Sequence, residues 1–191
     1  MARVGLFGGS FNPIHKGHLH LARQLYRLAQ LDELWFMVSP QNPLKQQSEL
    51  LSDAIRLKLV RLAVARCPHF KASDYEFQLP RPSYTWNTLE HLRVDYPDNE
   101  FTLIIGGDNW QRFSSWYRHE DILRQYQLAV YPREDCPIDA ATLPKNVLLA
   151  NCRLVNVSSS QIRQLIREQK PYAHLVPKAV ANAIEKEQLY R

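Results

Sequence analysis

Short apolar runs alternate with amphipathic segments along the whole chain. Residues 3–7 and 33–38 are mostly apolar, and between them apolar side chains recur every three or four positions over residues 17–30. A short apolar run bounded by turn residues indicates a buried strand, and the three-to-four spacing indicates a helix. These segments therefore predict a strand–helix–strand unit with a right-handed parallel crossover.

The alternation continues to the end of the chain. Further strands are predicted at residues 70–75, 101–105, 128–131, 147–150 and 153–156. Helices are predicted after Ser52, from Thr85, in short pieces over 110–126, from 157–160 to about 168, and from about 177 to 188. Strands that alternate with helices are typical of an α/β fold with a doubly wound, Rossmann-like parallel sheet and helices on both faces. We expect a single domain over 1–191, with 157–191 as its small C-terminal helical part.

Charge and cysteine content narrow the function classes. The chain has 191 residues, with 24 Lys and Arg against 19 Asp and Glu, a formal net charge of +5. This modest excess suits polyanionic small molecules, and there is no basic run typical of nucleic-acid binding. Cys67, Cys136 and Cys152 lack the spacing of a zinc site or a disulfide framework. No apolar run approaches the ~20 residues that span a bilayer, and the N-terminus lacks the apolar core of a signal peptide. We therefore expect a cytoplasmic protein that binds small molecules, with neither nucleic acid nor membrane as a partner.

The most informative segment is residues 8–18, Gly-Gly-Ser-Phe-Asn-Pro-Ile-His-Lys-Gly-His, which joins the first predicted strand to the first predicted helix. Its glycines let the backbone approach a ligand closely, Pro13 restricts the turn, and His15 and His18 are three residues apart. The N-terminus of a helix also attracts anions, because its first N–H groups have no partner within the helix. A glycine pair alone is often only a turn, but together these features predict a site that binds a triphosphate and stabilises charge on it.

Two more polar clusters follow predicted strands. Asp108 follows the glycine pair 106–107, where its carboxylate can accept hydrogen bonds from a ribose diol or can simply cap a helix. The serines of 158–160 and Arg163 begin a helix, where hydroxyls, N–H groups and a guanidinium can bind an anion. Because the carboxyl ends of parallel strands lie at one edge of a sheet, we expect all three clusters to converge.

On these motifs the chain resembles bacterial nicotinate-nucleotide adenylyltransferases, members of the HxGH nucleotidyltransferase superfamily. The matching elements are the segment 8–18, Pro-Ser-Tyr-Thr at 82–85, Ile-Ile-Gly-Gly-Asp at 104–108, Trp-Tyr at 116–117, Ser-Ser-Ser-Gln-Ile-Arg at 158–163 and Gln-Leu-Tyr-Arg at 188–191. They span nearly the whole chain, and the elements at 82–85 and 116–117 are the ones that favour nicotinate nucleotide. The resemblance implies an enzyme of NAD biosynthesis that makes nicotinate adenine dinucleotide and pyrophosphate from ATP and nicotinate mononucleotide.

The resemblance also implies which residues bind the two substrates. Those implied for ATP are His15, His18, Gly8, Gly9, Ser10, Phe11, Gly106, Asp108, Ser159, Ser160 and Arg163. Those implied for the pyridine nucleotide are Ser83, Tyr84, Thr85, Trp116 and Tyr117. The Trp116 ring would stack on the pyridine, whereas Trp110 is expected to pack in the core. Lys45 would reach a phosphate from the loop 40–51, but Leu44 stands where relatives often carry a histidine, so a solvated loop lysine is the alternative.

The implied reaction needs little proton chemistry. The attacking nucleotide phosphate is already ionised at neutral pH, so positioning and charge neutralisation would carry the catalysis. The sequence shows no carboxylate cluster for a metal, and Mg²⁺ would be carried on the ATP phosphates. The alternatives are an adenylyltransferase for nicotinamide mononucleotide or phosphopantetheine, and a non-catalytic nucleotide- or RNA-binding module. Whether the chain forms a homo-oligomer stays open.

Overall fold

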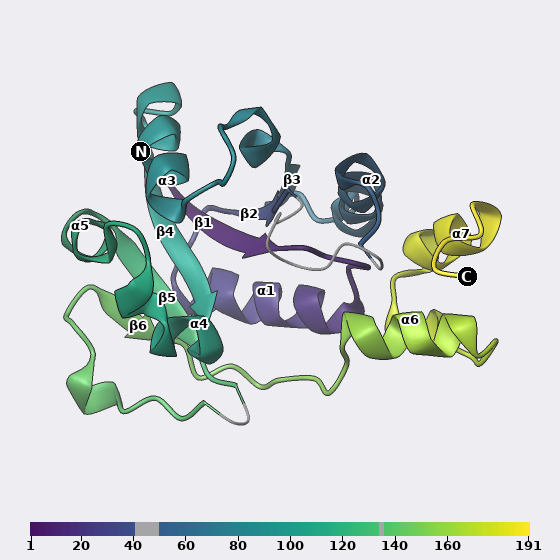
Figure 1. The fold of residues 1–191 in the computed structure, drawn as a ribbon. Helices are drawn as coiled ribbons and strands as arrows, with labels where there is room; N and C mark the ends of the chain where they lie inside the picture. The colour runs from purple at the N-terminus through teal and green to yellow at the C-terminus, as the bar shows by residue number, and fades with distance from the viewer. Residues whose placement is uncertain (41–49, 134–135) are drawn as a thin grey trace.

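The central element is a parallel sheet. The computed structural model describes residues 1–40, 50–133 and 136–191. Within them the strands form one six-stranded sheet in the order β3-β2-β1-β4-β5-β6, with every neighbouring pair parallel (Figure 1). The strands are β1 (Ala2–Gly9), β2 (Glu33–Val38), β3 (Phe70–Ser73), β4 (Asn99–Gly106), β5 (Gln127–Tyr131) and β6 (Val147–Leu149). The strand order reverses between β1 and β4, which is where doubly wound sheets bind ligands.

The register brings the strand ends level with one another. Gly9, at the end of β1, is opposite Val38, at the end of β2. On the other side, Gly106 at the end of β4 is opposite Tyr131 at the end of β5. The segments that follow these four strands therefore leave the sheet along the same edge, as the sequence predicted.

Helices cover both faces of the sheet, which confirms the doubly wound α/β fold. They are α1 (Lys16–Leu28), α2 (Asp53–Val64), α3 (Thr85–Asp95), α4 (Gly107–Gln111), α5 (His119–Gln125), α6 (Ser159–Arg167) and α7 (Lys178–Lys186). Apolar side chains of α1, α2, α6 and α7 share one core cluster with Phe7 and Phe36, and those of α3 and α5 share another with Leu6 and Trp35.

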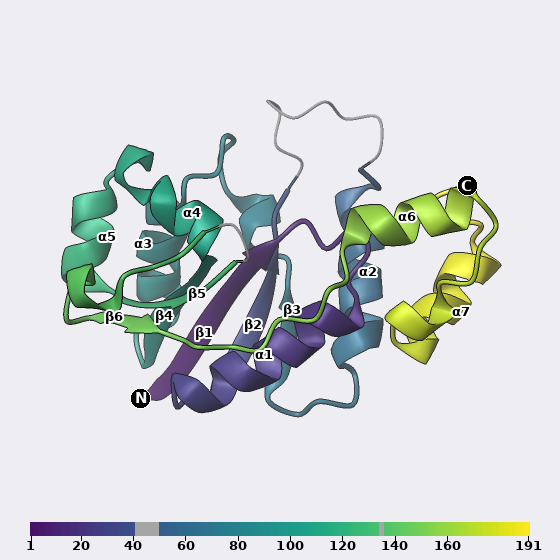
Figure 2. The same ribbon diagram turned by 90° about the horizontal axis from the view of Figure 1, so that it is seen from below.

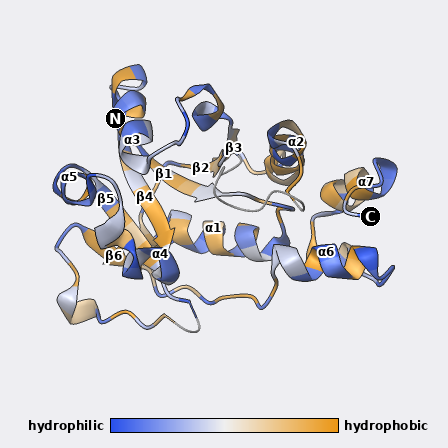
Figure 3. Cartoon of the chain, in the orientation of Figure 1, coloured by the Kyte–Doolittle hydropathy of each residue, from blue (hydrophilic) through white to orange (hydrophobic). Residues whose placement is uncertain are grey.

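The strand sequences explain how one sheet has two buried faces. Along β2, Leu34, Phe36 and Val38 belong to one cluster, whereas Trp35 and Met37 belong to the other. Side chains of a strand alternate between faces, so a continuous apolar run fits a strand that is covered on both sides. In Figure 3, β4 is orange along most of its length, while the surrounding helices carry both orange and blue.

The predicted strand at 153–156 is wrong. In the structure this segment is an extended connection that passes α1 on its way from β6 to α6 (Figure 2). Its backbone is paired by a helix side chain: the Arg153 N–H donates to Oε1 of Gln24 at 2.8 Å, and Nε2 of Gln24 donates to the Arg153 carbonyl at 2.9 Å. These bonds satisfy the same backbone groups that a strand would have paired.

The C-terminal helices α6 and α7 lie beside the sheet, on the side away from α3, α4 and α5 (Figures 1 and 2). Lys58 of α2 makes an ion pair with Glu187, just after α7, at 2.5 Å. Serine caps start two of the helices as the sequence predicted, since Ser52 accepts from the N–H of Ile55 and Ser158 from that of Gln161. The predicted strand at 70–75 is shorter than expected, because a 3-10 turn begins at Tyr75.

Candidate active site

A cavity of about 870 Å³ lies at the carboxyl ends of β1, β2 and β4. Its lining brings together residues that are far apart in the sequence, from the segment after β1, from α3, from the β4–α4 junction and from α6. The predicted site residues that line it are Gly8, Gly9, Ser10, Thr85, Gly106, Trp116, Ser159, Ser160 and Arg163. The expected convergence of the three polar clusters is therefore present.

The other predicted residues lie next to this cavity or away from it. Phe11, His15, His18, Asp108, Ser83, Tyr84 and Tyr117 are not among its described lining residues. Tyr84 is 46% and Tyr117 52% exposed, and their rings lie 5.0 Å apart. Lys45 lies outside the residues that the structure describes.

The glycine-rich loop (residues 8–14) is fixed by side chains that bind its carbonyl oxygens. Arg56 donates to the Ser10 carbonyl at 2.6 Å, and Arg163 donates to the Asn12 carbonyl at 2.9 Å. The Ser159 hydroxyl donates to the Pro13 carbonyl at 2.9 Å. Helices α2 and α6, which are separated by 94 residues in the sequence, thus fix the conformation of one short loop.

The two histidines form a reciprocal cap at the start of α1. Nδ1 of His15 accepts from the N–H of His18, and Nδ1 of His18 accepts from the N–H of His15, both at 3.3 Å. The rings stack with centroids 3.7 Å apart, and the Phe11 ring meets His18 edge-on at 5.1 Å. A nitrogen that accepts a hydrogen bond carries no proton, so the proton of each neutral ring is on Nε2. Each histidine can therefore offer an Nε2–H donor to a ligand.

Burial keeps both histidines uncharged. It lowers the pKa of His15 to about 4, helped by the nearby positive charge of Arg133. The pKa of His18 lies well below its usual value, chiefly because of burial and then because of His15 and Arg133. At neutral pH the pair thus acts through hydrogen bonds and contributes no positive charge of its own before a ligand binds.

Because both histidines have lowered pKa values, we expect the protein to become less stable to unfolding at acidic pH. A histidine has a pKa of 6.5 in the unfolded chain, whereas that of folded His15 is about 4, so the unfolded state binds more protons between these values. The free energy of unfolding should fall as pH decreases through this window, by about 1.4 kcal/mol per pH unit for each histidine. Urea unfolding at pH 7 and pH 5.5 should show a smaller difference for His15→Asn than for the unchanged protein, because Asn keeps the cap without titrating. An identical difference in both would contradict a neutral, buried His15.

Gly106 is a position where a side chain would disturb its neighbours. A Cβ built there would lie 2.6 Å from Oδ1 of Asp108 and 3.1 Å from Nε of Arg133. These two groups form an ion pair with Nε and Oδ1 3.5 Å apart at the start of α4. The glycine thus allows a carboxylate and a guanidinium to lie directly beside the cavity wall.

Three charged residues in or near the cavity were not predicted from the sequence. Arg133 follows β5 and lies close enough to lower the pKa of both histidines. Glu76 lines the cavity, accepts from the Thr88 hydroxyl at 3.0 Å, and has its pKa raised by burial. Both follow predicted strands, so the strand-end argument could have found them. Arg56 carried no such signal, because it occupies an ordinary helix position.

Trp116 and Trp110 differ in their position relative to the cavity. Trp116 lines the cavity and also contacts Phe113, with ring centroids 5.4 Å apart. Trp110 stacks on the same Phe113, with ring centroids 5.4 Å apart, and packs against the core. Trp110 is absent from the described cavity lining. Trp116 is therefore placed to meet a ligand, and Trp110 to support the core.

Clusters of metal ligands and membrane-spanning helices are both absent from the described residues. In 1–40, 50–133 and 136–191, no three His, Cys, Asp or Glu side chains are grouped as metal ligands. The helices in this part of the chain are all too short or too polar to cross a membrane.

Comparison with known proteins identifies the family of this chain. A model of the family described as cytidylyltransferase-like matches residues 6–165. The chain belongs to the cytidylyltransferase-like family. A Bacteroides thetaiotaomicron protein named "Probable nicotinate-nucleotide adenylyltransferase" is 50% identical to this family member over 168 residues, or 88% of this chain and 83% of that protein. A protein of the same name from Cytophaga hutchinsonii is 44% identical over 188 residues, covering 98% of both chains. These relatives confirm the resemblance that the motifs predicted.

Solved structures share the fold of this cytidylyltransferase-like chain at low sequence identity. The Plasmodium falciparum nicotinic acid mononucleotide adenylyltransferase complexed with NaAD has a TM-score of 0.81 at 18% identity, covering 100% of this chain and 98% of that one. A putative nicotinate-nucleotide adenylyltransferase from Vibrio parahaemolyticus has a TM-score of 0.73 at 23% identity, covering 100% of this chain and 96% of that one. At such identities the likeness concerns the fold.

Proposed function

We propose that this protein transfers the adenylyl group of ATP to nicotinate mononucleotide, giving nicotinate adenine dinucleotide and pyrophosphate. The observation that carries the proposal is that the glycine-rich loop, Gly106, Arg163 and Trp116 all line the same cavity. The 50% identity between this chain and the Bacteroides thetaiotaomicron protein, which is named for this activity, supports the proposal further. The partners of such an enzyme are small nucleotides, and we place it in the cytoplasm.

In this proposal the ATP phosphates lie at the loop and at the start of α6. Arg163 is the one Lys or Arg among the described lining residues, and it shares this end of the cavity with the hydroxyls of Ser159 and Ser160. Backbone N–H groups at the start of a helix add to the attraction for a triphosphate. Gly106 and Asp108 would bind the adenosine, since a carboxylate can accept hydrogen bonds from a ribose diol.

The pyridine nucleotide is assigned to the wall formed by Thr85 and Trp116, with Ser83, Tyr84 and Tyr117 nearby. Trp116 would stack on the ring, as flat cationic rings do on aromatic side chains. Glu76 is the one acidic residue among the described lining residues, and its carboxylate suits the positive charge of a pyridinium ring. A bound cation would offset the desolvation that raises the pKa of this carboxyl.

The chemistry follows from these contacts. An oxygen of the mononucleotide phosphate attacks the α-phosphorus of ATP, the bond to the β-phosphate oxygen breaks, and pyrophosphate leaves with the electron pair. No general base is needed, because the attacking phosphate is ionised. The Nε2–H groups of the histidines and the Arg163 guanidinium would donate to oxygens whose charge grows in the transition state. Mg²⁺ enters as part of the ATP substrate, held by its phosphates and water.

A substrate panel tests the proposal. Pyrophosphate release is measured with ATP and each of nicotinate mononucleotide, nicotinamide mononucleotide and phosphopantetheine, and with CTP in place of ATP. We expect release with ATP and nicotinate mononucleotide together and with neither alone. Release with another acceptor but none with nicotinate mononucleotide would reject the assignment. RNA retained in a filter-binding assay, without release, would favour the non-catalytic alternative.

Trp116 gives a prediction that is specific to the pyridine end. Trp116→Leu keeps an apolar contact with Phe113 but removes the stacking surface, which is worth about 1–3 kcal/mol per ring. The KM for nicotinate mononucleotide should rise by about 5- to 100-fold, with the KM for ATP within about twofold. Steady-state kinetics with each substrate varied in turn would measure this. Trp110→Leu, which removes the other tryptophan that contacts Phe113, is the matched control, and an equal effect there would assign Trp116 to packing alone.

A further inference from the structure

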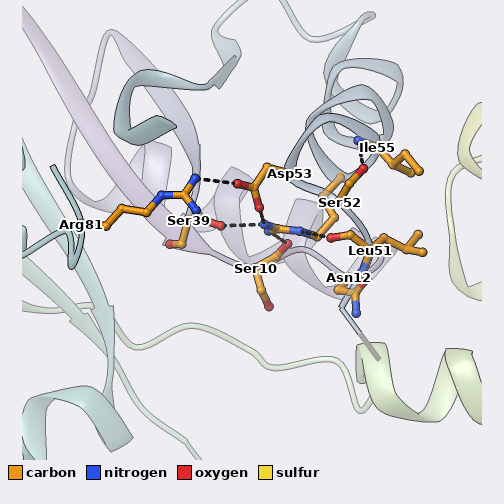
Figure 4. Close-up of polar contacts among 9 residues, drawn as sticks. Ser10, Asn12, Ser39, Leu51, Ser52, Asp53, Ile55 and Arg81 are labelled. Carbon is orange, nitrogen blue, oxygen red and sulfur yellow. Dashed lines mark hydrogen bonds and ion pairs between the residues drawn. The ribbon is translucent and has the colours of Figure 1, made fainter. Parts of the chain in front are cut away.

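Arg56 is a charged side chain with no exposed surface, in the first turns of α2. A buried guanidinium is costly unless its donors are satisfied. Here it donates to the carbonyls of Leu51 at 3.0 Å, Ser10 at 2.6 Å and Ser39 at 2.8 Å, and to Oδ1 of Asp53 at 2.5 Å (Figure 4). Only an arginine presents a planar fork of donors that can reach several acceptors in different directions.

The acceptors belong to three separate segments around the cavity. Ser10 is in the glycine-rich loop, Ser39 directly follows β2, and Leu51 lies two residues before the start of α2. Ser10 and Ser39 both line the cavity, whereas Arg56 is not among its described lining residues. Arg56 therefore acts on the cavity from behind, through the backbone of residues that form its wall.

The hydrogen bond from Arg56 to the Ser10 carbonyl fixes the orientation of the next peptide group in the loop. The Ser10–Phe11 peptide is trans, so the Phe11 N–H points opposite to the Ser10 carbonyl that Arg56 binds. Phe11 has a φ of 46°, in the left-handed region that a bulky residue rarely adopts. Backbone N–H groups around such a residue form concave anion sites. Arg56 thus fixes the peptide that would present its N–H to a phosphate.

Asp53 extends the contact to a further segment, which leads to the cavity wall at Thr85. Its Oδ2 accepts from Arg81 at 3.1 Å, while Oδ1 accepts from Arg56 (Figure 4). Arg81 begins the short segment that leads to Thr85, which lines the cavity at the end assigned to the pyridine nucleotide. The hydrogen bonds Arg56–Asp53 and Asp53–Arg81 thus connect the glycine-rich loop with the segment that leads to Thr85.

We propose that Arg56 is a positioning residue that sets the phosphate-binding conformation of the glycine-rich loop, and that Asp53 and Arg81 align the segment 81–85 with it. The proposal rests on the proposed function in assigning ATP to the loop end and the pyridine nucleotide to the 81–85 end. A residue that only stabilised the fold would change the melting temperature and leave the kinetics of the folded protein unchanged.

The first test is Arg56→Lys, which keeps the charge and loses the fork. The probe is an ATP analogue with a methylene bridge between the α- and β-phosphorus, titrated into the folded protein by calorimetry. We expect its Kd to rise at least tenfold and kcat to fall 10- to 100-fold, with far-UV circular dichroism unchanged. A Kd and kcat within twofold of the unchanged protein would overturn the proposal. Should Arg56→Lys not fold, Asp53→Asn is tested by the same measurements of Kd and kcat with the same expected changes, since it removes the charge that pairs with Arg56.

The second test separates the two ends of the cavity. Arg81→Gln removes the exposed half of the link, and should raise the KM for nicotinate mononucleotide 3- to 10-fold without changing the Kd of the ATP analogue. Arg61→Gln is the matched control, because Arg61 lies on α2, the helix of Asp53 and Arg56, and makes a comparable surface ion pair with Asp74 at 3.2 Å. Equal effects from Arg81→Gln and Arg61→Gln would overturn the extension to 81–85. Binding of the analogue needs no second substrate, so its Kd tests the role of Arg56 independently of the substrate panel, which tests the nicotinate assignment.

Discussion

Replacing His18 with Asn is expected to lower kcat by about two to three orders of magnitude while the protein stays folded. Removing one preorganised donor to a developing charge typically costs a factor of this size. The side-chain oxygen of Asn can take over the bond that Nδ1 of His18 accepts from the His15 N–H, so the cap survives. The variant therefore removes only the Nε2–H donor. Pyrophosphate release with both substrates at saturation, together with the melting temperature, measures the two effects separately.

His18→Gln is the companion variant. Its amide nitrogen reaches about as far as Nε2, and the side-chain oxygen of Gln at this position of a capping box can accept from the His15 N–H. It should retain more activity than His18→Asn, with a melting temperature close to that of the unchanged protein. His20→Asn, on the same helix and two residues further on, is the control that should leave kcat unchanged. If His18→Asn is as active as the unchanged protein, the histidine has no part in the transition state.

Much of the fold follows from local pattern. Apolar runs in β1, β2, β4 and β5 are bounded by glycine, serine, proline or polar residues, and a two-sided core needs such runs. The segment 153–156 has the same appearance, with Leu154 and Val155 between polar residues. Its backbone partner is the side chain of Gln24, 129 residues earlier, and no local pattern reveals that a helix side chain replaces a neighbouring strand.

The site was predictable where its residues follow strands. The loop after β1 and Gly106 at the end of β4 meet because parallel strands end together. The third cluster also reaches the cavity, although no strand precedes it, because α6 lies against the loop through the Ser159 and Arg163 hydrogen bonds. The predicted convergence was thus correct, while the argument for its third member was not.

Arg56 shows what the sequence could not reveal. An arginine in an amphipathic helix is normally solvated, and its burial here depends on carbonyls from three segments that meet only in the folded chain. The charge state of His15 and His18 depends on folding in the same way. Their pKa values are lowered by burial and by Arg133, which follows a different strand. Residue type and spacing indicated a phosphate site, but not that its histidines are neutral donors.

Arg163 carries the second large effect. Arg163→Met is expected to lower kcat/KM by about 10²- to 10³-fold, because it removes two contributions at once. Charged hydrogen bonds to phosphate are among the strongest that a side chain makes, and Arg163 is the one Lys or Arg of the described lining. Its Nη1 also donates to the Asn12 carbonyl at 2.9 Å, and its Nη2 to the Ser160 hydroxyl at 3.3 Å. Loss of the bond to Asn12 removes one of the three side-chain contacts that fix the glycine-rich loop.

Arg163→Lys separates these contributions. A lysine restores a charge near the phosphates but cannot bind the loop and a phosphate with one planar group. The KM for ATP should recover to within about tenfold of the unchanged protein, while kcat stays low, because loop geometry matters most in the transition state. Arg167→Met, one turn further along α6, is the control for loss of a helix charge. Full recovery of kcat with lysine would show that Arg163 contributes charge alone, and that Ser159 and Arg56 suffice to position the loop.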